Sequence, residues 1–288
     1  MSGPEFGSVY GVDFSGAKQA GRCIWVARTE PRARGRLALV ALDRLDALCG
    51  TAERGACLAA LVQLVNASDA ALWGFDCPFG LPVELFPAGA PWSDQFAFLE
   101  GYDGAAYECG LECVRRTKRM RGALHRTRLH CRRRSDLEAK APFDAFHYRM
   151  IYQTFYGMRD VVRPLAATPR TAVLPFQYRK LPRALRVVVE CCPASVLKKD
   201  ALPHQNYKRP KGGPLPRRHL RTRHDILAGL EKLVRIGDRH RRVIMRNPGG
   251  DALDAVVAAA GALRGFCAAD HHALARDPRL TREGWMYV

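Results

Sequence analysis

Three short apolar runs, each ending at or near an acidic residue, constrain the fold of this 288-residue chain more than any other feature. The runs are VYGVDF (9–14), ALWGFD (71–76) and LRVVVECC (185–192). Gly- or Pro-containing turns follow the first two, and the third has the near-continuous apolar pattern of a buried strand. Because Asp is depleted in strands and costly to bury unpaired, acids at these ends indicate a functional site.

The surrounding pattern predicts a mixed sheet flanked by helices. Residues 22–28 and 37–43 resemble two further strands, so the first three strands are predicted to form a meander. Helical spacing of apolar residues predicts helices over 51–67 and 224–237, and over the Ala-rich stretch that begins at Ala252. A strand meander followed by alternating helices and strands is typical of the α/β class.

Two segments stand apart from this pattern. Residues 80–184 are rich in Pro, aromatic residues and Arg, show no strand alternation, and are predicted to form a mainly helical, basic insertion. The first eight residues, MSGPEFGS, have no apolar signal core and are typical of an expression-tag remnant. The sequence therefore predicts a single domain over residues 9–288, with an insertion at about 80–184.

Five acids are predicted to meet at one edge of the sheet. Asp13 and Asp76 end the first and fourth predicted strands, Glu190 lies near the end of the fifth, and Asp251 and Asp254 open the late helix. Ligand sites in open α/β sheets form at the carboxyl ends of strands. Each acid alone has an ordinary alternative explanation as a helix cap, a turn residue or an ion-pair partner. Their joint placement at these ends favours a shared site.

Clustered carboxylates repel one another unless divalent cations lie among them. Mg²⁺ prefers hard oxygen ligands, and a pair of such ions can stabilise the attacking and leaving oxygens of a phosphoryl displacement. We therefore predict a Mg²⁺ or Mn²⁺ site held by Asp13, Asp76 and Asp254, with Asp251 and Glu190 as further catalytic residues that bind or orient. Zinc is a weaker alternative, because Cys109 and Cys113, with His125, His130 and Cys131, match no standard finger spacing.

The charge balance favours a polyanionic partner. The net charge is +18 with a pI near 9.9, and residues 115–134 and 208–223 hold ten and seven Lys or Arg and no acid. A solvated face is the ordinary explanation for such runs. We predict nucleic acid as the partner, bound by Arg115, Arg116, Lys118, Arg119, Arg132, Arg133, Arg134, Lys208, Arg209, Lys211, Arg217 and Arg218.

Aromatic residues in the insertion offer a second kind of contact. Two interpretations of these aromatic residues are open. They pack in the core, which is the commoner role of a helical aromatic stripe, or they stack on unpaired bases. The residues are Phe143, Phe146, Tyr148, Tyr152, Phe155 and Tyr156. No segment approaches the roughly 20 apolar residues that span a bilayer, so we expect no membrane association, and the scattered cysteines favour a reducing cytoplasm.

Five short blocks resemble the signature of one protein family. In order, they are YGVDFSGA, GFDCPFGLP, VVECCPASVLK, GGDALDAVVAAAGAL and the terminal EGW. They are similar to blocks of domain-of-unknown-function family 429 (DUF429), which is predicted to be nuclease-like with a ribonuclease H-like fold. The resemblance covers residues 9–82 and 185–288 and is weak across the insertion.

The resemblance implies a ribonuclease H-like sheet with an acidic metal site. It makes Asp13 the first-strand acid and Asp76 the fourth-strand acid. Asp251 and Asp254 are similar to the paired acids on the late helix of RuvC-type resolvases. Glu190 fits the family's Glu-x-x-Pro block but has no place in a minimal three-acid site.

Three functions remain open at this point. The first is a metal-dependent nuclease that acts through the carboxylates. The second is a non-enzymatic nucleic-acid-binding module, and the third is a phosphohydrolase or phosphotransferase that acts on a small phosphorylated metabolite. No G-x-S-x-G elbow and no G-x-x-x-x-G-K-[ST] loop occurs, which disfavours acyl transfer and P-loop nucleotide hydrolysis.

Overall fold

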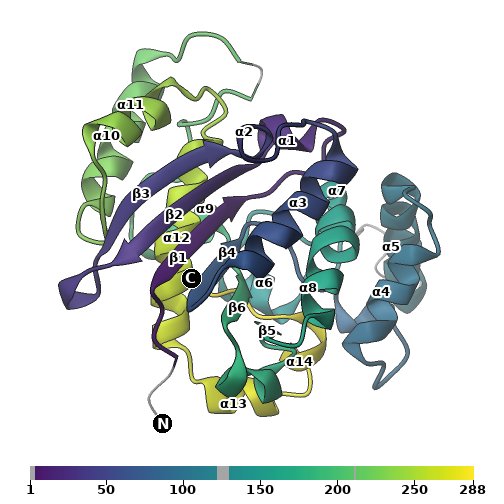
Figure 1. Ribbon diagram of the computed structural model, residues 1–288. Coiled ribbons are helices and arrows are strands. Elements are labelled where there is room, and N and C mark those ends of the chain that lie inside the picture. The colour runs from purple at the N-terminus through teal and green to yellow at the C-terminus, as the bar shows by residue number, and fades with distance from the viewer. Residues whose placement is uncertain (1–3, 122–129, 211) are drawn as a thin grey trace.

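A seven-stranded mixed sheet forms the centre of the molecule, with helices on both faces (Figure 1). The computed structural model describes residues 4–121, 130–210 and 212–288. Within them the strand order is β5-β6-β4-β1-β2-β3-β7. The strands are β1 (Ser8–Asp13), β2 (Trp25–Pro31), β3 (Leu37–Arg44), β4 (Ala71–Phe75), β5 (Thr171–Val173), β6 (Arg186–Glu190) and β7 (Val234–Arg235). The predicted α/β class, a mixed sheet flanked by helices, is confirmed.

The sheet combines an antiparallel meander with parallel strands. β1, β2 and β3 are antiparallel neighbours, as predicted, and β4 and then β6 join β1 in parallel. Val12 lies opposite Phe75, and Phe75 lies opposite Glu190. The carboxyl ends of β1, β4 and β6 are therefore side by side at one edge of the sheet.

The late helix α12 (Asp251–Ala268) packs directly on one face of the sheet. Glycines in β1 and β4 permit this close approach. A Cβ atom at Gly11 would lie 2.0 Å from the carbonyl oxygen of Ala255, and one at Gly74 would lie 2.5 Å from the Cβ of Ala262. The small side chains of α12 and these two glycines thus set the position of the helix over β1 and β4.

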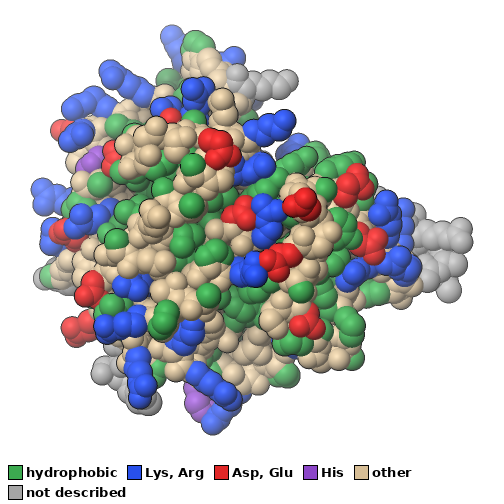
Figure 2. All heavy atoms as spheres, turned by 45° about the vertical axis from the view of Figure 1, so that its right-hand side comes forward, with side chains coloured by type: hydrophobic (Ala, Val, Ile, Leu, Met, Phe, Trp, Pro, Cys, Tyr) green, Lys and Arg blue, Asp and Glu red, His purple; other side chains and the backbone are tan. Residues whose placement is uncertain are grey.

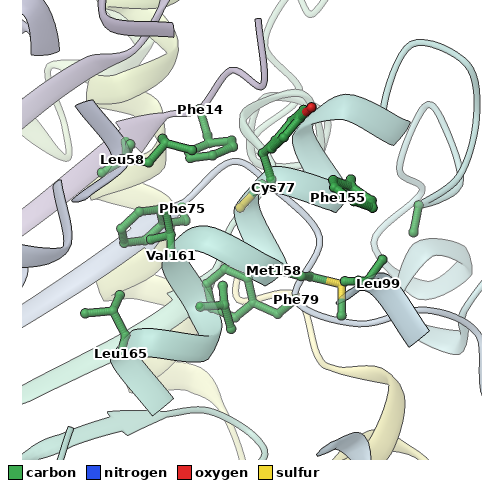
Figure 3. Close-up of a cluster of buried hydrophobic side chains, with 14 of the residues drawn as sticks. Phe14, Leu58, Phe75, Cys77, Phe79, Leu99, Phe155, Met158, Val161 and Leu165 are labelled. Atoms are coloured by element: carbon green, nitrogen blue, oxygen red, sulfur yellow. The ribbon is translucent and has the colours of Figure 1, made fainter. Parts of the chain in front are cut away.

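An aromatic and aliphatic cluster fills the opposite face (Figure 3). Leu58 from α3 (Arg54–Ala67) and Val161 from the π-helical segment η4 (Gly157–Val162) lie around Phe75 of β4, with Phe14 just beyond the end of β1. All four side chains are buried. The insertion is thus anchored to the sheet by its own apolar residues, because η4 belongs to it.

The segment predicted as a helical insertion is mainly helical in its described part. It contains α4 (Trp92–Glu100), α5 (Ala106–Arg121), α6 (Arg134–Glu138), α7 (Ile151–Tyr156), η4 and α8 (Arg163–Ala167). It also supplies β5, a three-residue edge strand too short for sequence alternation to reveal. The remaining helices are α1 (Ala20–Cys23), α2 (Leu45–Cys49), α9 (Pro193–Lys199), α10 (Arg217–Leu230), α11 (Asp238–Arg246), α13 (His271–Arg276) and α14 (Leu280–Glu283).

Several predicted boundaries were wrong. The helix predicted over 224–237 is α10, which ends at Leu230, because Val234 pairs with Leu37 in the edge strand β7. The strand predicted over 22–28 begins only at Trp25, after the short helix α1. Ser8 pairs with Ala71 in β1, so the ordered sheet extends into the segment set aside as a tag remnant. In the described part of the chain, no helix has the length and apolar character needed to cross a membrane.

Candidate metal centre

Three aspartates from separate elements meet at the carboxyl ends of the parallel strands. Asp13 is the last residue of β1, Asp76 follows β4 directly, and Asp254 lies in the first turn of α12. One carboxylate oxygen from each residue lies within 4.8 Å of those of the other two. These three carboxylates could hold a divalent metal ion, because they are the hard, anionic oxygen ligands that such ions prefer.

Local backbone geometry explains how these side chains converge. The amide of Asp76 donates a 2.9 Å hydrogen bond to the carbonyl of Val12, which continues the parallel register one residue beyond β4 and holds Asp76 beside Asp13. Gly250 precedes α12 with φ +88°, a left-handed conformation that glycine adopts readily. This turn starts the helix at Asp251, so that Asp254 falls on the face that meets β1.

The cluster concentrates negative charge where water is scarce. Burial raises the pKa of Asp13 well above its usual value, and neighbouring Asp254 raises it further, although the Lys208 ammonium opposes both effects. Burial, together with the Asp254 carboxylate, raises the pKa of Asp76 to about 7. A bound cation would remove the repulsion that produces part of these shifts.

Tyr207 and Lys208 complete the surroundings of Asp254. The Tyr207 hydroxyl donates a 2.8 Å hydrogen bond to one carboxylate oxygen of Asp254, and the Lys208 ammonium forms an ion pair with the other. The sequence placed Lys208 in a phosphate-binding run and gave no role to Tyr207. No sequence signal distinguishes Lys208 from the other cations of that run, because its role depends on where the loop before α10 folds back.

The cluster opens into a cavity of about 560 Å³. Asp251 lines this cavity together with the three aspartates, and burial raises its pKa. From the insertion, Phe143, Arg149, Met150 and Gln153 line the same space. Its volume lies within the range of ligand pockets in proteins.

Glu190 lies in the same cavity but has a different environment. The Arg133 guanidinium donates to both of its carboxylate oxygens, at 2.5 and 2.7 Å, and the Phe79 amide donates to one of them at 2.9 Å. Arg133 also donates to Asp136, at 2.7 Å, and its side chain is only 1% exposed. Glu190 therefore belongs to a compensated buried ion-pair network beside the aspartate cluster.

The predicted phosphate-binding residues separate into three groups. The prediction that Arg133 binds phosphate was wrong. Its side chain is buried and engaged by Glu190 and Asp136, and so it has no free surface for a phosphate. Lys208 lies at the aspartate cluster. Most of the others lie on the surface, and some of them are ion-paired. Arg115, Arg116 and Arg119 surround Glu112, Arg134 pairs with Glu138 and Asp277, and Arg132 donates to two carbonyls. The remaining exposed members are Lys118, Arg209, Arg217 and Arg218.

Lys211 and the part of the first basic run between 122 and 129 lie outside the described residues. Figure 2 shows Lys and Arg side chains at several places on one face of the molecule, with acidic side chains among them near the centre of the view. The positive charge is therefore distributed over this face rather than confined to one patch.

The aromatic residues of the insertion also divide. Phe146, Phe155 and Tyr156 are buried in the core, whereas Tyr148 and Tyr152 are 64% and 44% exposed. Among the described residues, the aspartates are the only set of three or more Asp, Glu, His or Cys side chains close enough together for a metal. The zinc alternative thus finds no support in that part of the chain, and His125 lies outside it.

Comparison with known proteins identifies the family. The model of DUF429, described as a protein family of unknown function, matches residues 11–275. The chain belongs to the DUF429 family. No curated protein and no solved structure matched it. The family match spans both sheet-forming regions and the insertion, and so it covers every aspartate of the cluster.

Proposed function

We propose that this DUF429 protein is a Mg²⁺- or Mn²⁺-dependent nuclease with a ribonuclease H-like fold. The observation that carries the proposal is the meeting of Asp13, Asp76 and Asp254, from β1, the end of β4 and α12, with carboxylate oxygens within 4.8 Å of one another. Surplus buried negative charge without a matching set of cations is costly, and divalent ions relieve that cost.

Each residue of the site has a distinct proposed role. Asp13, Asp76 and Asp254 hold the metal, which when bound supplies positive charge that stabilises the transition state of phosphodiester cleavage. Tyr207 orients Asp254 through its hydrogen bond, and Asp251 adds a second carboxylate in the same first turn of α12. Glu190 acts as an orienting residue, because Arg133 already engages both of its oxygens.

Lys208 has a dual position in this scheme. Its ammonium pairs with Asp254 and also lines the cavity, with its side chain 38% exposed. With the Asp254 carboxylate engaged by a divalent ion, the Lys208 ammonium would be available to contact a phosphate of the substrate. The net charge of +18 supports a polyanionic substrate, since phosphate contacts by Lys and Arg supply most of the affinity of nucleic-acid binding.

The test is cleavage of labelled oligonucleotides, single-stranded, duplex and branched, in Mn²⁺ or Mg²⁺ and in EDTA. We expect Asp13→Asn and Asp254→Asn to lower the cleavage rate by at least about 100-fold, because even residues outside the metal's own ligand set cost 10- to 100-fold when removed. Asp225→Asn, at an exposed position of α10, is the matched control and should retain full activity. Full activity in both site variants would refute the metal centre.

The same assay separates the two alternatives. A phosphohydrolase on a small metabolite is favoured by the size of the cavity, about 560 Å³, and would turn over mononucleotides without competition from oligonucleotides. A non-enzymatic binding module is favoured by the Lys208–Asp254 ion pair, which partly neutralises the cluster without metal. It would bind oligonucleotides in a salt-sensitive manner, show no turnover, and be indifferent to the Asp→Asn changes.

A further inference from the structure

An aromatic surface adjoins the aspartate cavity, which Phe143 and Arg149 line, and it is exposed at Tyr148 and Arg149. We call it the aromatic rim and define it by Phe143, His147, Tyr148 and Arg149. The rings of Phe143 and His147 are stacked with centroids 4.4 Å apart, and those of His147 and Tyr148 are also 4.4 Å apart. The Arg149 guanidinium lies 5.5 Å from the Phe143 centroid and donates a 3.0 Å hydrogen bond to the Tyr148 hydroxyl.

The rim is held in place from beneath rather than being a loose loop. Phe146 of the same turn is buried in the core. The buried carboxylate of Asp144 accepts a hydrogen bond from the Phe146 amide, and its other oxygen lies 2.7 Å from Nδ1 of His130. Thr154 fixes the turn further by donating to the carbonyl of Ala145. The side chains that remain outside are thus presented in a fixed arrangement, which lowers the entropic cost of binding.

The rim is also coupled to the strand ends that carry the aspartates. Gln153 donates one hydrogen bond of 2.7 Å to the carbonyl of Phe14 and another of 3.2 Å to the carbonyl of Asp76. Phe143 and Arg149 line the same cavity as the three aspartates. A ligand that fills the cavity therefore reaches the carboxylates and two residues of the rim, Phe143 and Arg149.

The chemistry of the rim fits unpaired bases. Tyr148 is 64% exposed, the highest value among the exposed large hydrophobic side chains of the described residues. Flat aromatic rings beside a guanidinium bind single-stranded nucleic acid, because every base offers a face for stacking and the cation neutralises a phosphate. Paired bases in a duplex are stacked on one another and do not offer these faces.

We propose that the aromatic rim binds unpaired bases and that the substrate class of the site is single-stranded polynucleotide. The cleavage part of this inference rests on the proposed nuclease function, whereas the binding part does not. The two parts are therefore tested separately, with binding measured in EDTA, where no metal-dependent reaction occurs.

The binding experiment uses fluorescence anisotropy with labelled oligo-dT, oligo-U and a DNA duplex of equal length. We expect the Phe143→Ala/Tyr148→Ala double variant to weaken single-strand binding by about 10-fold or more, because each stacked base contributes substantially. Duplex binding should change less than about 2-fold. Comparison of oligo-dT with oligo-U decides whether the bases come from DNA or RNA.

Two controls and one further rim variant make the outcome interpretable. Tyr148→Phe retains the ring and should bind as wild type, and Tyr107→Ala removes a ring that is 52% exposed on α5, outside the cavity lining. Arg149→Ala should also lower the salt dependence of binding by about one phosphate contact. Equal affinity of the wild type for single strand and duplex, or an equal loss of affinity in Tyr107→Ala, would overturn the proposal that the rim binds unpaired bases. A single-strand preference that depends on the rim, without any cleavage in Mn²⁺, would support base binding by the rim and refute the proposed nuclease activity.

Discussion

Two acidic clusters lie side by side at the carboxyl edge of the sheet, and their charge is balanced in different ways. In one, Glu190 and Asp136 share a single guanidinium, that of Arg133, which is buried with them. In the other, Lys208 forms an ion pair with Asp254, and its ammonium also opposes the rise that burial causes in the pKa of Asp13 and of Asp76. The first cluster has two carboxylates around a cation that is 1% exposed, and the second has three around a cation that is 38% exposed.

The difference shows how buried acids in one cavity divide between structure and function. The Arg133 guanidinium forms a fork that engages both oxygens of Glu190, so this network is closed to other ligands. The aspartate cluster has a surplus of negative charge, and burial raises the pKa of Asp13 and Asp76. The Arg133–Glu190–Asp136 network holds the wall of the cavity in place. The net negative charge of the three aspartates, by contrast, favours binding of a cation.

Breaking the closed network should have the largest effect on stability. Arg133→Met would leave two carboxylates buried without their cation, and we expect the free energy of unfolding to fall by about 3–5 kcal/mol in urea denaturation. Arg134→Met is the matched control, because its ion pairs with Glu138 and Asp277 are half-exposed and should contribute about 1 kcal/mol or less. Similar losses in the two variants would show that the network does not support the fold.

The pH dependence of stability should distinguish the open cluster. Burial first, and then Asp254, raises the pKa of Asp76 to about 7, from 3.8 in the unfolded chain. The folded protein therefore binds more protons than the unfolded chain between these values, and this contribution to stability is lost as pH rises through 7. We expect the free energy of unfolding in EDTA to fall by on the order of 1–4 kcal/mol between pH 4 and pH 7.

Asp76→Asn should flatten this dependence, since it removes the group that titrates, and Mn²⁺ should stabilise the wild type more at pH 8 than at pH 5. Urea denaturation over this range measures both. An identical pH dependence in the wild type and in Asp76→Asn would mean that Asp76 ionises as it does in water. That result would contradict the interpretation that the aspartate cluster holds excess negative charge.

The smallest expected effect concerns Lys208. Lys208→Gln removes a positive charge that competes with a metal for Asp254, so we expect Mn²⁺ to bind about 10-fold more tightly, or about 1.4 kcal/mol. Isothermal titration of the metal measures this directly. Lys118→Gln, at an exposed position on α5, should leave the affinity unchanged. Weaker Mn²⁺ binding in Lys208→Gln would show that the ammonium organises the carboxylates instead of competing for them.

Much of the site could be predicted from local sequence, because strand ends and helix starts have clear local signals. The apolar runs before Asp13 and Asp76 and the glycines before Asp251 fixed where each acid lies on its element. That Asp13 and Asp76 would lie side by side required β1 and β4 to be neighbours, which the parallel register confirms. The β7 strand was missed because its pairing with Leu37 competes with a helical pattern in the same residues.

The partners of the acids could not be predicted, because each of them comes from a distant part of the chain. Arg133 lies 57 residues from Glu190, and nothing in its Arg-rich run distinguishes it from the members that the structure places on the surface. Lys208 lies 46 residues before Asp254, in a loop without regular structure. The local sequence pattern predicts where a helix or strand begins and ends. An ion pair depends on how distant loops fold over that element.

By itself, the sequence determined the five longer strands, the late helix and the acids that end or begin them, since periodicity and turn residues act over a few positions. The tertiary structure alone decided which acids remain in surplus and which are neutralised. It also decided which aromatic rings of the insertion enter the core and which stay exposed. The physical reason is that burial and charge compensation are properties of the whole packed chain, set by contacts between residues far apart in sequence.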